Sequence, residues 1–90
     1  MKYTVVLTDE ARKILKKLDQ PIALLITGWI RKNLENCSDP RQHGKSLTAN
    51  HRGQWRYRVG DYRILAEIQD AQITILIVTI GHHKNIYKTE

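Results

Sequence analysis

The sequence predicts one α+β domain, in which an N-terminal strand and a two-helix hairpin pack on a small antiparallel sheet. An early strand-forming run, two helical apolar patterns joined at a proline, and an alternating C-terminal half support this class. Ninety residues suffice for one modest hydrophobic core. The expected order is therefore β-α-α-β-β-β, within a single domain spanning residues 1–90.

The first strand is expected over residues 3–7, because this run is rich in strand-forming residues. Thr8 is placed to cap a helix, and Asp9 and Glu10 fall in its first turn, where the helix dipole favours acids. The apolar positions that follow recur at helical spacing and define one buried face. These positions are Ala11, Ile14, Leu15 and Leu18.

The second helix is expected to begin near Pro21, whose fixed φ suits a first turn. Its tight connection to the first helix predicts an antiparallel pair. Gly28 is expected to permit close contact between helices, and the helix to end around Asn36 to Ser38. The apolar stripe of this helix comprises Ile22, Leu25, Ile26, Trp29, Ile30 and Leu34.

The stretch from Gln54 to Leu65 has the pattern of a β-hairpin with a Gly60-Asp61 turn. Counting outward from the turn gives the pairs Val59–Tyr62, Arg58–Arg63, Tyr57–Ile64 and Arg56–Leu65. One face then carries Trp55, Tyr57, Val59, Tyr62, Ile64 and Ala66, and the other carries Arg56, Arg58 and Arg63. Arginines directly opposite each other repel, which suggests a phosphate-like ligand. A solvated strand face is the alternative.

The last strand is expected over Gln72 to Ile80, after a turn at Asp70-Ala71. Its nearly continuous apolar character predicts a central position or cover on both faces. The turn places Ile77 opposite Ile64 and Val78 opposite Arg63. The strand therefore ends beside the arginines, and Gly81 lets the chain turn there. One concave corner is expected to gather Arg56, Arg58, Arg63, His83 and Tyr87.

Charge also points to a polyanionic partner. The chain has 15 Lys and Arg against 9 Asp and Glu, a formal net charge of +6. Much of the excess lies in the hairpin and in the long polar loop over residues 41–52 before it. The predicted contacts to this polyanion, for which RNA is a candidate, are Arg41, His43, Lys45, Arg52 and Lys84.

Such a corner suits RNA chemistry, because RNA carries its own nucleophile in the 2′-hydroxyl. An enzyme must align that hydroxyl, remove its proton and protonate the departing 5′-oxygen, and arginines can offset the charge that develops on the phosphate. Histidine suits the proton transfers near neutral pH. Tyr87 is an alternative base, or a residue that stacks on a nucleobase.

No metal or cofactor is expected. The four histidines and one cysteine lack the spacing of a structural zinc site, and adjacent His82 and His83 are expected to diverge. The sequence contains no Gly-rich nucleotide-binding loop, and acids near the corner are limited to Asp61 and Glu67. The proposed chemistry is therefore metal-independent.

A cytoplasmic protein without membrane association is expected. Cys37 has no partner for an internal disulfide, which fits a reducing compartment. No signal peptide precedes the first strand, and the apolar runs are too short to span a bilayer.

Three segments resemble the RelE/ParE superfamily of bacterial toxins, and the RelE branch in particular: residues 39–47, 53–64 and 81–87. The resemblance implies the fold and a ribosome-dependent endoribonuclease that cuts mRNA in the ribosomal A site. Arg56 and Arg58 match the paired basic positions of the family, Arg63 the arginine of the Gly-x-Tyr-Arg element, and Tyr87 the tail tyrosine. His83 stands where many members have arginine, so both a phosphate contact and proton transfer stay open for it.

The resemblance also implies the partners. These are a RelB-like antitoxin, the ribosome and mRNA, with operator DNA bound only through the toxin–antitoxin complex. Two alternatives remain at the level of sequence. One is a ParE-like toxin that inhibits DNA gyrase without nuclease chemistry, and the other is a non-catalytic module that binds the ribosome or RNA.

Overall fold

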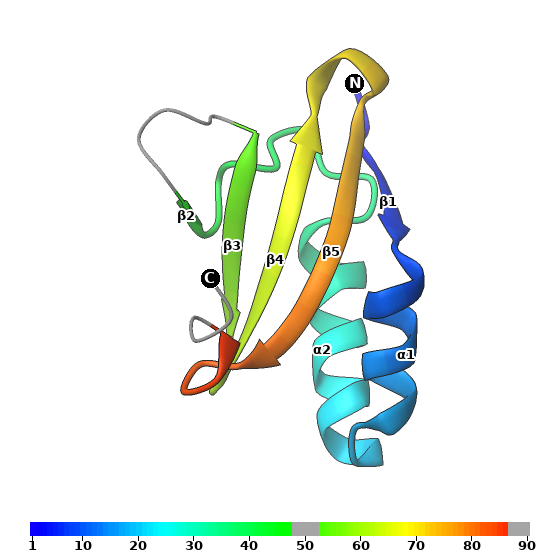
Figure 1. The fold of residues 1–90 in the computed structure, drawn as a ribbon. Helices are drawn as coiled ribbons and strands as arrows, with labels where there is room; N and C mark the ends of the chain where they lie inside the picture. Colours follow the sequence, from blue (N-terminus) through cyan, green and yellow to red (C-terminus); the bar gives the residue numbers. More distant parts are fainter. Residues whose placement is uncertain (48–52, 87–90) are drawn as a thin grey trace.

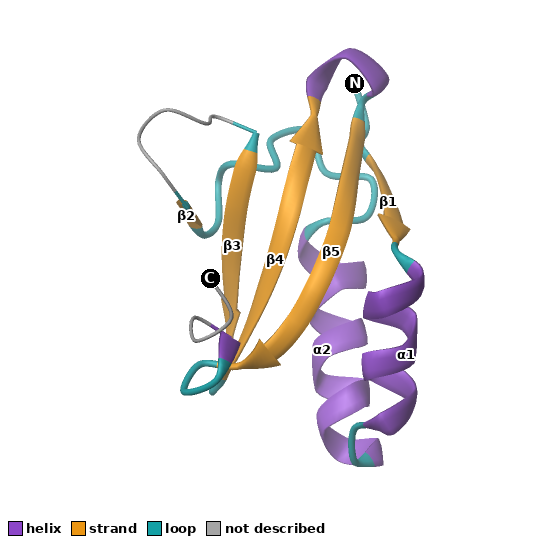
Figure 2. Ribbon diagram, in the orientation of Figure 1, coloured by secondary structure: helices purple, strands orange, loops and turns teal. Residues whose placement is uncertain are grey.

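Two helices cover one face of a five-stranded sheet, and in the described residues no α-helix covers the other (Figure 1, Figure 2). The computed structural model describes residues 1–47 and 53–86. The elements are β1 (Thr4–Leu7), α1 (Asp9–Lys17), α2 (Gln20–Asn33), β2 (Lys45–Ser46), β3 (Gln54–Val59), β4 (Tyr62–Gln69) and β5 (Thr74–His82). The sheet order is β1-β5-β4-β3-β2. The α+β class is confirmed.

The sheet contains two edge strands, β1 and β2, that the predicted antiparallel sheet did not include. The three antiparallel strands β3, β4 and β5 form its centre, as expected. However, β1 runs parallel to β5, and the additional strand β2 pairs with β3 within the long basic loop. None of the helices in the described part of the chain is long and apolar enough to cross a membrane.

Thr8 joins β1, α1 and β5. As predicted, it caps α1: its Oγ1 accepts a hydrogen bond from the Ala11 amide at 3.1 Å. The same hydroxyl donates to the Val78 carbonyl at 2.7 Å, and the Thr8 amide donates to the Ile77 carbonyl at 3.0 Å. The junction between strand and helix is therefore tied to the middle of β5.

The second helix ends earlier than the sequence suggests. It stops at Asn33, and the predicted end at Asn36 to Ser38 is wrong. The reason is a backbone exchange with Tyr3, which accepts from the Asn36 amide at 2.9 Å and donates to the Cys37 carbonyl at 2.8 Å. Asn36 takes a left-handed φ of 63° to make that exchange possible.

Two expectations for the face of α2 are also wrong. Leu25 is 56% exposed, because it lies about 100° around the helix from the buried Ile26. Gly28 does not serve a close contact, since a Cβ there would meet no atom within 4 Å. The inward face of α2 is instead centred on Ile26 and Ile30, and it continues into Leu34 directly after the helix; all three are buried.

The hairpin of β3 and β4 has the predicted register at all four pairs, including Arg58 opposite Arg63. Gly60 adopts a positive φ of 59°, as the first position of a tight hairpin turn requires. The apolar face points toward the helices, and Tyr57, Val59, Ile64 and Ala66 are buried. Arg56, Arg58 and Arg63 consequently lie on the opposite face.

The register between β4 and β5 differs from the prediction by three residues at Arg63. Ile64 lies opposite Ile80 and Arg63 opposite Gly81, instead of Ile77 and Val78. The connection over residues 70–73 is longer than a two-residue turn, because it contains a 3₁₀ turn and a left-handed Ile73 with φ 50°. A β-bulge adds the third residue: Val78 has no partner between the pairs Ala66–Ile77 and Leu65–Thr79.

Candidate functional site

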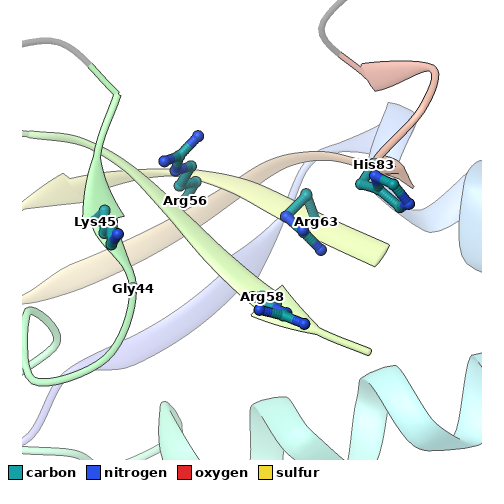
Figure 3. Close-up of a pocket in the computed structure, with 6 residues that line it drawn as sticks. All are labelled: Gly44, Lys45, Arg56, Arg58, Arg63 and His83. Atoms are coloured by element: carbon teal, nitrogen blue, oxygen red, sulfur yellow. The ribbon is translucent and has the colours of Figure 1, made fainter. Parts of the chain in front are cut away.

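A cleft of about 540 Å³ lies on the helix-free face of the sheet, and its walls are cationic (Figure 3). Its lining residues come from β2, β3, β4 and the chain at the end of β5. None of the lining residues is acidic, so the cleft favours an anionic ligand. The lining comprises Gly44, Lys45, Arg56, Arg58, Arg63 and His83.

The β3–β4 pairing sets the positions of the arginines. Arg58 and Arg63 are directly opposite each other, and in the described part of the chain neither forms an ion pair. One Arg63 nitrogen donates to the Gly60 carbonyl at 3.2 Å and to the Tyr62 carbonyl at 3.1 Å. These bonds hold one terminal nitrogen of the guanidinium, and its other donors can meet a phosphate.

Strand β2 brings Lys45 directly opposite Arg56. This approach depends on Gly44, which has a φ of 78° and where a Cβ would collide with the Arg56 carbonyl oxygen. The Trp55 indole donates to the His43 carbonyl at 2.6 Å and fastens the loop to β3. The sequence predicted a role for Lys45 but not this pairing. The signal that was available is a single glycine in front of a short run that can form a strand.

His83 lies where the chain turns after β5, and its amide donates to the Asp61 carbonyl of the hairpin turn at 2.9 Å. The rings of His82 and His83 stack with centroids 4.7 Å apart, so the prediction that they diverge is wrong. Strand alternation does not continue here, because the Asn85 amide closes a turn onto the His82 carbonyl at 2.9 Å. Within residues 1–47 and 53–86, no group of three potential ligands could hold a metal ion.

Arg41 is not among the residues that line the cleft. Its guanidinium forms two bonds to the Asp70 carboxylate, at 3.0 and 2.9 Å, and lies 5.8 Å from the centre of a Trp55 ring. Asp70 also accepts a hydrogen bond from the Tyr3 hydroxyl at 2.8 Å, and this bond raises the pKa of Tyr3. Arg41 thereby links the basic loop to the β4–β5 connection.

The remaining predicted site residues are spread more widely. The His43 ring packs edge-on against Trp29, with ring centroids 5.7 Å apart. Lys84 is exposed in the turn after β5. Arg52 and Tyr87 lie outside the described residues, so their roles remain predictions. The structure thus brings together Arg56, Arg58, Arg63, His83 and Lys45 from the predicted set.

This chain is similar in sequence and in structure to several known proteins. The family model described as the ParE toxin of the type II toxin–antitoxin system parDE matches residues 5–87. Toxin RelG of Mycobacterium tuberculosis is 33% identical over 88 residues, which cover 98% of this chain and 99% of RelG. A chain of the toxin–antitoxin complex RelBE2 from M. tuberculosis superposes with a TM-score of 0.78 at 32% identity, covering 91% of this chain and 92% of that one.

A more distant structure shows the same fold. A mutant of the E. coli toxin RelE in the free state superposes with a TM-score of 0.72 at 13% identity, over 97% of this chain and 90% of that one. The family match and the similarity to RelG both extend over nearly the whole chain. The chain therefore belongs to the RelE/ParE superfamily and is a toxin of a type II toxin–antitoxin system.

Proposed function

We propose that this toxin is a ribosome-dependent endoribonuclease that cleaves mRNA in the A site. The observation that carries the proposal is the cationic cleft, in which Arg58 faces Arg63 and no acidic residue contributes to the lining. Like charges directly opposite each other lower the stability of a sheet. A phosphate held between them offsets that repulsion, and the scissile phosphate of RNA has the matching charge and geometry.

In the proposed reaction the 2′-oxygen attacks the adjacent phosphorus and the bond from phosphorus to the 5′-oxygen breaks. The products are a 2′,3′-cyclic phosphate and a 5′-hydroxyl. One proton leaves the 2′-hydroxyl and another reaches the 5′-oxygen. Arg56, Arg58 and Arg63 offset the negative charge that develops on the phosphate oxygens. The nucleophile belongs to the substrate, so the reaction requires neither a metal nor a covalent enzyme intermediate.

His83 is assigned to proton transfer in this proposal. Imidazole is the side-chain type best suited to general acid–base catalysis, and the other lining residues are glycine, lysine and arginine. This assignment favours proton transfer over a pure phosphate contact. Tyr87 is proposed as the partner for the second transfer, on the basis of the family resemblance alone.

The proposed partners are a RelB-like antitoxin, the ribosome and mRNA, all in the cytoplasm. The similarity to a chain of a toxin–antitoxin complex supports the antitoxin. The net charge of +6 supports contact with ribosomal and messenger RNA. Binding to operator DNA is proposed to occur only through the antitoxin complex.

Primer extension on a message translated in a cell-free system tests this proposal. The wild-type toxin should produce new 5′ ends within the reading frame, and R63A should lower the cleavage rate about 10²- to 10³-fold. R12A is the matched control, because Arg12 lies on α1 and pairs with Asp9 at 3.9 Å, outside the cleft. Equal cutting by the wild type and R63A would refute the proposal, and ribosome binding without cutting would indicate a non-catalytic module.

Inhibition of DNA gyrase is the second candidate, because the matching family model is that of ParE toxins. This activity requires binding to gyrase and no proton transfer by His83. Gyrase-catalysed supercoiling of a plasmid in the presence of purified toxin separates the two candidates. A ribonuclease leaves supercoiling unchanged at concentrations that stop translation.

A further inference from the structure

The chain that follows β5 folds back, so that Ile86 packs directly on Gly81. Ile86 is only 8% exposed, although it lies just four residues from the end of β5. A Cβ at Gly81 would lie 3.2 Å from Cδ1 and 3.3 Å from Cβ of Ile86. Both distances are tighter than ordinary van der Waals contact. The space left by the missing side chain of Gly81 is therefore filled by Ile86.

This contact lies on the cleft side of the sheet. Ile80 is buried in the core under the helices, so the next residue, Gly81, faces the opposite way. Gly81 is also directly opposite Arg63, and directly opposed residues share a face. Ile86 does not join the core cluster, so its packing serves the tail rather than the helix–sheet interface.

The fold-back closes a short turn that carries His83. At its base, Ile86 lies on Gly81. Within it, the Lys84 amide donates to Nδ1 of His82 at 3.1 Å and the Asn85 amide to the His82 carbonyl at 2.9 Å. The amide of His83 is held by the Asp61 carbonyl at 2.9 Å. Figure 3 shows the resulting position of His83, beside Arg63 at the end of the cleft.

We propose that Gly81 and Ile86 are positioning residues, whose contact holds the turn that presents His83 to the phosphate in the cleft. The proposal rests on the proposed function and extends it to two residues that do not themselves touch the substrate. A side chain at position 81 must push Ile86 away by a few tenths of an ångström. That movement shifts the imidazole relative to Arg63, and misplacement of a catalytic group by about 1 Å can cost about 100-fold in rate.

Single-turnover cleavage on programmed ribosomes tests the proposal with a matched pair of glycine substitutions. G81A should lower the rate at saturating toxin about tenfold, with little change in affinity, because the arginines of the cleft remain. G28A is the control, since a Cβ at Gly28 meets no atom within 4 Å. I86A should slow cleavage similarly, because it removes the same contact with Gly81. Rates are compared per folded molecule, with the folded fraction taken from urea denaturation, because truncating a buried isoleucine also lowers stability.

A rescue variant separates positioning from a general loss of structure. I86V removes Cδ1, the Ile86 atom nearest to the new methyl group, so G81A/I86V should cut faster than G81A. Amide hydrogen exchange at His83 gives a readout that does not depend on activity: it should accelerate in G81A and not in G28A. Wild-type cutting rates together with unchanged His83 exchange in G81A would overturn the positioning proposal. Failure of the wild type to cut would refute the proposed function instead, and the exchange result would still decide whether Gly81 holds the turn.

Discussion

Arg41 and Arg58 both lie in the basic part of the chain formed by the long loop and the β3–β4 hairpin, but the charges around them differ. Arg41 forms two bonds to Asp70, so its charge is compensated within the fold. Arg58 faces Arg63 and has no acidic partner among the described residues. The comparison teaches that the number of arginines in a segment does not locate a ligand site. What locates it is the absence of nearby carboxylates, and five predictions follow from that distinction.

The largest expected effect is on activity in R58A. The proposed cleavage rate should fall about 100-fold, because one of the cations that offset the charge on the phosphate is lost. The free energy of unfolding should stay the same or rise by a few tenths of a kcal/mol, since a cross-strand repulsion disappears. Primer extension and urea denaturation measure the two quantities. A loss of more than about 1 kcal/mol of stability would show that Arg58 is structural, as Arg41 is.

The next effect is on stability, in Y57F. The buried Tyr57 hydroxyl donates to the Pro40 carbonyl at 2.6 Å and so anchors the residue that precedes Arg41. Its removal leaves a buried carbonyl without that donor, which should cost about 1–3 kcal/mol in urea denaturation. Cleavage by the remaining folded protein should be unchanged, because Tyr57 lies on the opposite face from the cleft.

The same variant gives a pH dependence of known sign. Burial raises the pKa of Tyr57 in the folded chain above its ordinary value of 10.0. The unfolded chain therefore loses this proton at lower pH than the folded chain, and stability falls as the pH rises above about 10. Urea midpoints of the wild type should decline more steeply than those of Y57F between pH 9 and pH 11. Parallel declines would show that other groups cause the alkaline loss.

R41A should have a smaller effect on stability. The Arg41 side chain is 22% exposed and that of Asp70 is 53% exposed, so solvent weakens the pair and the expected loss is about 1 kcal/mol. Thermal or urea unfolding measures this loss. Cleavage should stay within about twofold of the wild type. A 100-fold loss of cleavage in R41A would place Arg41 in the functional site and remove the contrast with Arg58.

The smallest effect concerns the salt dependence of RNA binding. Each cation that contacts a phosphate of single-stranded RNA contributes about 0.7 to the slope of log K against log salt concentration. R58A should lower that slope by about this amount, and R41A should leave it unchanged. Fluorescence anisotropy with a labelled oligoribonucleotide between 50 and 200 mM salt measures both. Equal changes in the two variants would mean that both arginines contact RNA.

The parts of the fold that follow from local rules could be predicted from the sequence. A two-residue turn fixes every pair of the β3–β4 hairpin, so the Arg58–Arg63 pair was found by counting outward from Gly60. The β4–β5 register was missed, because a left-handed isoleucine at position 73 has no sequence signature. The Arg41–Asp70 pair joins residues 29 positions apart, and only the assembled fold reveals such a pair. For the site, the arginines were predictable from alternation, whereas the Lys45–Arg56 pairing depends on β2.

The bulge at Val78 divides β5 into two parts that differ in which alternate residues face the helices. Before it, Ile75 and Ile77 point to the helices; after it, the alternation is inverted, so that Ile80 is again buried and Gly81 faces the cleft. Without the extra residue, Gly81 would point inward and Ile80 outward. Because of this one unpaired residue, the positions of β5 that face the core before the bulge do not determine which positions face the cleft after it. The residues after the bulge can therefore shift by one position relative to the cleft, while Ile75 and Ile77 continue to face the helices.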